Sequence, residues 1–209
     1  MSKDPYSHLA GVFDVLFEPM NRGLRLIGRA MYRPTKGMKI LDVGCGTGTH
    51  LELYRKYDCA LHGIDMSESM LQRSRKRLNG AADLRMADAC NVPFDNGTFD
   101  LVISMLMLHE MDEAMRPQAI NEMNRVVKKD GRILLIDFHT GPYRFFKGWL
   151  TKVVIVFSEI VAGRRHFRNY RHFMSIRGLS PLLSASTLVV EQEKVVGGGG
   201  LVLYLLRKT

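Results

Sequence analysis

The stretch KILDVGCGTGTHL, residues 39–51, combines a carboxylate with three closely spaced glycines. Asp42 lies two residues before Gly44, and Gly46 and Gly48 follow at alternate positions. Glycines in a tight turn let the backbone approach a ligand without interference from Cβ atoms. Free N–H groups at the start of a following helix attract an anion, whereas the Asp42 carboxylate attracts a cation. The stretch therefore predicts a ligand that carries both charges, as an amino acid does.

The spacing of these glycines differs from the dinucleotide-binding fingerprint. That pattern, G-x-G-x-x-G/A, requires a small third residue at position 49, where this chain has Thr49. Asp42 is a second objection, because a carboxylate beside the turn repels a pyrophosphate. The sequence therefore argues against a nicotinamide or flavin dinucleotide.

Two more acids follow apolar stretches further along the chain. Asp65 ends the predicted strand 60–64, about 20 residues past the glycine turn, where this topology places a carboxylate on ribose hydroxyls. Asp88 follows the predicted strand 84–87, where it can accept from an adenine amine. An amino acid joined to ribose and adenine through a positive sulfonium is S-adenosylmethionine. An acidic cluster in a basic protein suits that charge.

The elements that must position these residues alternate along the chain. Residues 40–43 have the apolar character of a strand buried on both faces, and residues 49–57 follow as a predicted helix. Further strands are predicted at 60–64, 84–87, 99–104, 132–138, 187–196 and 201–207, and amphipathic helix lies within 6–33. Alternating strands and helices predict an α/β fold.

Four segments in register resemble the class I S-adenosylmethionine-dependent methyltransferases. They are LDVGCGTG, GIDMSESML, ADACNVPFDNGTFDLVISMLMLHEM and RVVKKDGRILLIDF, and the resemblance covers residues 39–138. Within that family the chain most resembles the ubiquinone/menaquinone biosynthesis methyltransferases and the small bacterial phosphatidylethanolamine N-methyltransferases. The resemblance implies a Rossmann-like seven-stranded sheet of order 3-2-1-4-5-7-6, with strand seven antiparallel and helices on both faces. It also implies S-adenosylmethionine as cofactor and S-adenosylhomocysteine as product.

The resemblance also assigns roles to single residues. Tyr6 would cap the methionine end of the cofactor and Met66 would stack on adenine; for both, a core-packing role is the alternative. The complete predicted cofactor-binding set is Tyr6, Asp42, Gly44, Cys45, Gly46, Gly48, Asp65, Met66, Asp88, Ala89, Ser104 and Met105.

The whole chain of 209 residues is long enough for one domain with a real core. We expect a helical N-terminal cap at 1–36 and an insertion on the substrate side at 139–178. Three cysteines without metal-ligand spacing predict neither a disulfide framework nor a zinc site. The sequence shows no signal-peptide pattern and no long apolar run, so we expect a cytoplasmic location. Peripheral contact with the inner face of the membrane is a further expectation.

The net charge of +9 indicates an anionic partner. Segment 141–177 holds eight basic residues, many aromatic residues and one acid, Glu159. Such a segment covers the sheet and lines a pocket, lies at a membrane interface, or binds RNA. The turn after strand four lacks the prolines found in methyltransferases of nucleobase amines, which argues against nucleic acid. The predicted substrate-binding residues are Arg164, Arg165, Arg168 and Tyr170.

Methyl transfer from a sulfonium depends on positioning and on exclusion of water, so a base is needed only for a protonated nucleophile. His109, just past strand four, and Tyr143 are the predicted catalytic residues; a structural role is the alternative for any single histidine. The first predicted acceptor is a phospholipid amine of the phosphatidylethanolamine type, and the second is the ring carbon of a quinone precursor. An RNA methyltransferase and a non-catalytic cofactor-binding protein are the remaining alternatives.

Overall fold

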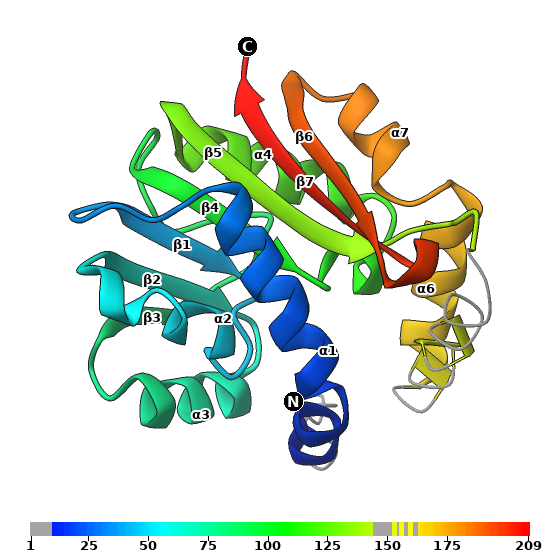
Figure 1. The fold of residues 1–209 in the computed structure, drawn as a ribbon, viewed down its shortest axis with the longest axis horizontal. Coiled ribbons are helices and arrows are strands. Elements are labelled where there is room, and N and C mark those ends of the chain that lie inside the picture. Colours follow the sequence, from blue (N-terminus) through cyan, green and yellow to red (C-terminus); the bar gives the residue numbers. More distant parts are fainter. Residues whose placement is uncertain (1–9, 144–151, 154, 157–158, 161–162) are drawn as a thin grey trace.

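The computed structural model describes residues 10–143, 152–153, 155–156, 159–160 and 163–209. One sheet runs through the molecule in the order β3-β2-β1-β4-β5-β7-β6 (Figure 1). β7 is antiparallel to β5 and β6, and the other neighbours are parallel. The predicted fold class and strand order are therefore confirmed. The strands are β1 Lys39–Val43, β2 Ala60–Asp65, β3 Ala82–Met86, β4 Phe99–Met105, β5 Val127–Phe138, β6 Leu188–Val196 and β7 Leu201–Lys208.

Helices pack on both faces of this sheet. α1 crosses the face turned to the viewer in Figure 1, and α4 lies behind the strands. The α-helices are α1 Ala10–Met31, α2 Thr49–Glu52, α3 Glu68–Leu78, α4 Met115–Val126, α6 Arg164–Ser175 and α7 Leu179–Ser184; short 3₁₀ turns are η1 Arg55–Tyr57, η2 Leu108–Glu110 and η3 Gly197–Gly199. No helix among these described residues combines the length and the apolar character needed to cross a bilayer.

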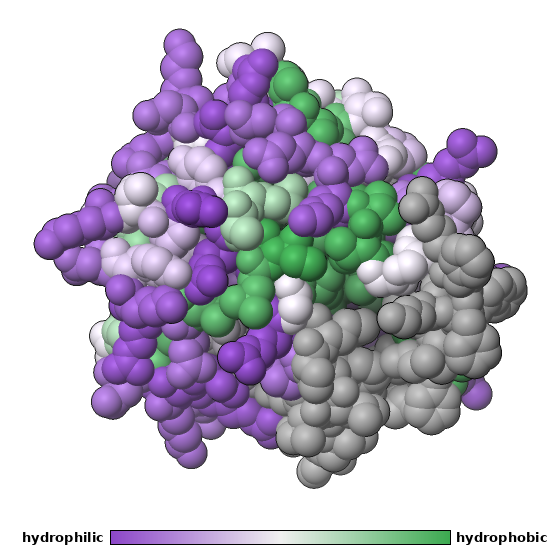
Figure 2. Space-filling model, viewed as in Figure 1, coloured by the Kyte–Doolittle hydropathy of each residue, from purple (hydrophilic) through white to green (hydrophobic). Residues whose placement is uncertain are grey.

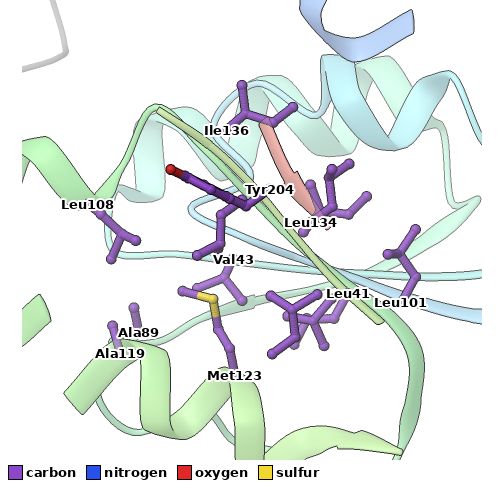
Figure 3. Packing of buried hydrophobic residues seen from close by; sticks show 14 of the residues in the cluster. Leu41, Val43, Ala89, Leu101, Leu108, Ala119, Met123, Leu134, Ile136 and Tyr204 are labelled. Atoms are coloured by element: carbon purple, nitrogen blue, oxygen red, sulfur yellow. The ribbon is translucent and has the colours of Figure 1, made fainter. Parts of the chain in front are cut away.

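The core lies between the sheet and the helices on its two faces. Ile40, Leu41 and Val43 of β1 have no exposed surface, which agrees with a strand covered on both sides. Figure 3 shows Ala119 and Met123 of α4 directed toward the strands. Burial of such side chains contributes most of the favourable free energy of folding.

α1 approaches β5 closely at Gly28. A Cβ atom at this position would lie 2.8 Å from a methyl group of Leu134 and 3.3 Å from one of Ile136. The glycine therefore lets the helix backbone rest on the strand, and it fixes where the N-terminal helix crosses the sheet.

Three elements differ from the sequence-based expectation. The helix after the glycine turn ends at Glu52, and residues 55–57 form a separate 3₁₀ turn. β3 ends at Met86, so Asp88 lies two residues beyond the strand. β5 begins at Val127, five residues earlier than predicted, because the Asp-Gly pair at 130–131 stays within the strand.

Gly131 explains the early start of β5. A Cβ atom there would lie 2.9 Å from the backbone oxygen of Phe99 and 3.0 Å from that of Asp100. The pairing of β4 with β5 shifts register between Phe99 and Leu101, which is the same place. Glycine at 131 therefore accommodates an irregularity in the ladder instead of ending the strand.

We expect Gly131→Ala to lower the free energy of unfolding by about 1–3 kcal/mol, because the methyl group meets backbone oxygens that cannot turn away. Urea unfolding followed by circular dichroism measures the change. Gly23→Ala in α1 is the matched control, since a Cβ atom added at Gly23 would have nothing within 4 Å. Equal unfolding midpoints for the Gly131 variant and wild type would contradict this packing.

Candidate functional site

The end of β2 holds the glycine turn in place. The N–H groups of Gly44 and Cys45 both donate to the carbonyl of Ile64, at 2.9 and 3.0 Å. The N–H of Gly46 donates to Oδ2 of Asp65 at 2.8 Å. Gly44, Gly46 and Gly48 have φ angles of 75°, 51° and 77°, the left-handed region that favours glycine. The three glycines are thus required by the shape of the turn.

The predicted anion site at a helix N-terminus is not supported by this geometry. α2 has four residues, so its dipole is small, and Gly48 at its N-cap donates to the carbonyl of Cys45 at 2.9 Å. The N–H groups of Gly44, Cys45 and Gly46 are used within the protein. The turn therefore offers close backbone approach more than free N–H donors.

Asp65 has a structural role that the sequence did not reveal. Its Oδ1 accepts from the N–H of Ser67 at 2.8 Å while Oδ2 holds Gly46. Ser67 caps α3 by accepting from the N–H of Met70 at 3.3 Å. Met66, between them, is 67% exposed, so the core-packing alternative for Met66 was wrong.

Asp42 lies in the interior beside a buried arginine. Burial raises the pKa of Asp42 to about 7, and the neighbouring Asp65 carboxylate raises it further while Arg25 opposes the rise. Arg25 of α1 is 7% exposed and forms an ion pair with Glu18 at 2.9 Å. Sequence reasoning missed Arg25, although its spacing of seven residues from Glu18 places both on one side of the helix.

Polar atoms without protein partners lie near Asp42. Both ring nitrogens of His50 and the hydroxyl of Tyr54 are buried and make no hydrogen bond to the part of the chain that the structure describes. Burial, with a smaller contribution from Arg25, lowers the pKa of His50 to about 3, so the ring is neutral. Buried polar groups normally have partners, and these atoms suit a polar ligand or water.

Asp42, Asp65 and the glycine turn together fit S-adenosylmethionine. Asp42 and Asp65 are close enough to disfavour each other's charge, and a ligand with positive groups relieves that repulsion. A Cβ atom added at Gly46 would meet nothing within 4 Å, and such open space is what close backbone approach to a ligand requires.

The other predicted cofactor residues occupy several places. Tyr6 lies outside the described residues. Asp88 accepts from the N–H of Cys90 at 2.9 Å and is half-buried. The remaining residues are Cys45, whose thiol pKa is raised by burial, the buried Ala89, the buried Ser104 and the half-buried Met105.

A second cluster lies at the carboxyl end of β5. The ring Nδ1 of His109 lies 2.7 Å from Oδ1 of Asp137, and its Nε2 lies 3.5 Å from Oε1 of Glu159. His109 and Asp137 are each 2% exposed in their side chains, and Glu159 is 8% exposed. Phe138 packs against the imidazole with ring centroids 4.3 Å apart. The sequence therefore placed His109 correctly past β4 but missed both of its acidic partners.

Acidic side chains surround His109, and its role as a general base stays a prediction. Although burial opposes protonation, Asp137 and then Glu159 hold the pKa of His109 well above its ordinary value. A raised pKa favours the imidazolium form, which is a hydrogen-bond donor. Tyr143, the other predicted catalytic residue, is half-buried, and its hydroxyl donates to the carbonyl of His139 at 3.4 Å. Burial raises the pKa of this phenol.

Arg116 joins this cluster to α6. It is 1% exposed and donates to the carbonyls of Leu108 and Met111, at 3.0 and 3.1 Å. It also donates to the carbonyl of Asn169 at 2.9 Å. Asn169 in turn donates to the carbonyl of Glu110 at 2.7 Å. α6 is therefore anchored on η2 beside His109, beyond the carboxyl end of β5 (Figure 1).

The predicted substrate-binding residues lie on two sides of α6. Arg164, Arg165 and Arg168 are exposed, whereas Tyr170 is 5% exposed and faces inward. Asp112 holds Arg165 at 2.7 Å and lies 3.8 Å from Arg168. The sequence did not indicate this pairing, because Asp112 lies outside the basic segment.

We expect the affinity for S-adenosylhomocysteine, which keeps the amino-acid end, to fall about tenfold from about pH 8 to pH 6. The Asp42 carboxyl with its pKa of about 7 becomes neutral as pH falls, and it then loses its attraction for the ligand's ammonium. Calorimetry across this range measures the affinity. Asp42→Asn is expected to bind weakly at every pH; a wild-type affinity that is flat in pH would contradict the assignment.

The comparisons with known proteins agree with this geometry. Residues 41–135 match a family model described as a methyltransferase domain. The chain is 34% identical over 181 residues to a ubiquinone/menaquinone biosynthesis C-methyltransferase of Roseobacter denitrificans, covering 79% of this chain and 71% of that protein. It is 36% identical over 107 residues to a phosphatidylethanolamine N-methyltransferase of Cereibacter sphaeroides, covering 49% of this chain and 51% of that protein.

The fold is also shared with solved structures. An S-adenosylmethionine-dependent methyltransferase from Aquifex aeolicus aligns with a TM-score of 0.58 at 18% identity, covering 82% of this chain and 83% of that one. The chain spans about half the length of the first curated relatives that it matches, 51% and 44%. The quinone-pathway relative, at 71% coverage, extends the match over most of a protein. The chain therefore belongs to the class I S-adenosylmethionine-dependent methyltransferases.

Proposed function

We propose that this protein transfers a methyl group from S-adenosylmethionine to the amine of a phospholipid head group of the phosphatidylethanolamine type. The observation that carries the proposal is the pairing of opposite charges beyond β5. The exposed arginines lie on α6, which is anchored on η2, and η2 contains His109, the partner of the buried carboxylates of Asp137 and Glu159. A head group with a phosphate and an ammonium presents the complementary pair.

Asp42, Asp65 and the glycine turn would hold the cofactor, with Met66 exposed beside them. When bound, the cofactor supplies an activated methyl group on a positively charged sulfur. The chain itself contributes orientation and exclusion of water. The ends of β1 and β5 are two strands apart in the sheet, about 10 Å, so the two clusters share one edge.

The exposed side of α6 suits a phosphate. Arg164 and Arg171 are exposed, and the guanidinium group matches phosphate oxygens in a bidentate way. Val153 and Ile160, in the segment before α6, are 59% and 55% exposed. Exposed aliphatic groups beside arginines favour peripheral contact with an anionic membrane. Figure 2 adds that the face crossed by α1 presents a group of apolar side chains bordered in part by polar ones.

Methylation of a quinone-precursor ring carbon is the second candidate. It is favoured by the relative from Roseobacter denitrificans, which matches more of this chain than the phosphatidylethanolamine enzyme does. A quinone precursor is also an amphiphile that resides in membranes. It carries no phosphate, however, so it gives no role to the arginines of α6.

Incubation of the purified protein with labelled S-adenosylmethionine tests the proposal. Phosphatidylethanolamine in mixed micelles, a demethylated quinol and total RNA are the parallel acceptors. We expect label in the phospholipid. Label in the quinol alone would replace the first candidate with the second, and cofactor binding without any labelled product would indicate a non-catalytic protein.

We expect Arg164→Glu with Arg171→Glu to weaken binding to vesicles of phosphatidylethanolamine and phosphatidylglycerol at least tenfold. Each basic residue near such a surface contributes about 1 kcal/mol, so two losses amount to about 2 kcal/mol. Flotation of vesicles measures the bound fraction. Lys76→Glu with Lys129→Glu makes the same change in net charge; α3, which carries Lys76, lies across the molecule from α6 (Figure 1). If both double variants bound the vesicles to the same extent, the proposed role of α6 in membrane contact would be contradicted.

A further inference from the structure

Glu159 carries a buried carboxylate oxygen that no protein group satisfies within the described part of the chain. The residue is 6% exposed, and its Oε1 lies 3.5 Å from Nε2 of His109. Its Oε2 makes no hydrogen bond to any residue that the structure describes. Burying a carboxylate oxygen without a partner is unfavourable, so such an atom points to a ligand.

The charges around His109 leave a negative excess. Three carboxylates, those of Asp137, Glu159 and Glu110, lie within 2.7–3.8 Å of the imidazole. The basic side chains near these acids include His109, whose pKa is raised, the nearby Arg116, and His166, whose Nδ1 lies 3.8 Å from Oε2 of Glu110. Arg116 directs its N–H groups at backbone carbonyls and at a histidine. Glu159 shares the His109 imidazole with Asp137 and Glu110, so this ring cannot compensate all three carboxylates, and a further cation is favoured at Glu159.

Aromatic side chains lie near Glu159. Burial raises the pKa of Tyr170 to about 12, and both Tyr143 and Glu159 are near enough to raise it further. Phe138 meets Tyr170 edge to face, with ring centroids 5.5 Å apart. A carboxylate with aromatic side chains nearby favours an ammonium group over a neutral one.

We propose that Glu159 binds the protonated amino group of the methyl acceptor, with its Oε2 accepting a charge-assisted hydrogen bond from the nitrogen. The ammonium would release one proton to solvent before methyl transfer, and the neutral amine would keep a hydrogen bond from a remaining N–H to Oε2 while its lone pair accepts the methyl group; the carbon–sulfur bond breaks and S-adenosylhomocysteine leaves. The inference rests on the proposed function and deepens it, because it assigns the head-group specificity to one residue of the segment before α6. In this arrangement His109 and Asp137 position Glu159. The acceptor class is then an amine, and a neutral ring carbon finds no partner at Glu159.

Glu159→Gln tests this assignment, because it keeps the shape of the side chain and removes its charge. Methylation of phosphatidylethanolamine in mixed micelles gives KM and kcat, and calorimetry gives the affinity for S-adenosylhomocysteine. We expect KM to rise at least tenfold while the affinity for S-adenosylhomocysteine stays within about twofold of wild type. Glu113→Gln is the matched control, since Glu113 is 74% exposed and pairs with His172 at the surface; its KM should equal that of wild type.

A wild-type KM and kcat in Glu159→Gln would overturn the role of Glu159 and leave the proposed function standing. Label transferred by wild type to the quinol and not to phosphatidylethanolamine would overturn both. Retained affinity for S-adenosylhomocysteine shows that the variant is folded. Should that affinity be lost, Glu159→Asp, which keeps the charge and withdraws it by one methylene, is assayed with the same expectation for KM.

Discussion

The hydrogen bonds that tie the glycine turn to the end of β2 are the constraint on which the site depends. Two N–H groups converge on the carbonyl of Ile64, and a third reaches Asp65. They hold the turn after β1 against the neighbouring strand, so a backbone with three left-handed glycines keeps one shape. The same carboxylate also orders the start of α3 through Ser67. A single acid thus fixes the turn and the neighbouring helix that frame the cofactor site.

Two groups of acidic residues lie along the carboxyl edge of the sheet. At the end of β1, Asp42 lies within the electrostatic reach of Arg25 from the N-terminal helix, and its raised pKa reflects burial beside Asp65. At the end of β5, Asp137 and Glu159 enclose His109. The exposed arginines of α6 lie on a helix that is anchored on η2, which contains His109. The acidic groups Asp42, Asp137 and Glu159 are buried, whereas these arginines are exposed.

The apolar stretches and the glycine turn predicted most of the strands, whereas the strand order was implied by the resemblance to the methyltransferase family. Local patterns could not give the long-range partners. Gly131 looked like a turn residue, yet it lies within β5, since only the neighbouring strand's oxygens explain the need for glycine there. His109 was found from its position after β4, but its protonation depends on acids 28 and 50 residues away. One feature of the sequence did single out Glu159, which is the lone acid in the basic segment 141–177.

A crystal structure with S-adenosylhomocysteine tests the central claim most directly. We expect electron density along the carboxyl edge of β1 and β2, with the ammonium beside Asp42, the backbone of the glycine turn against the amino-acid end, and the ribose hydroxyls at Asp65. Density at another place, or an adenosine moiety that does not approach Asp65, would contradict it.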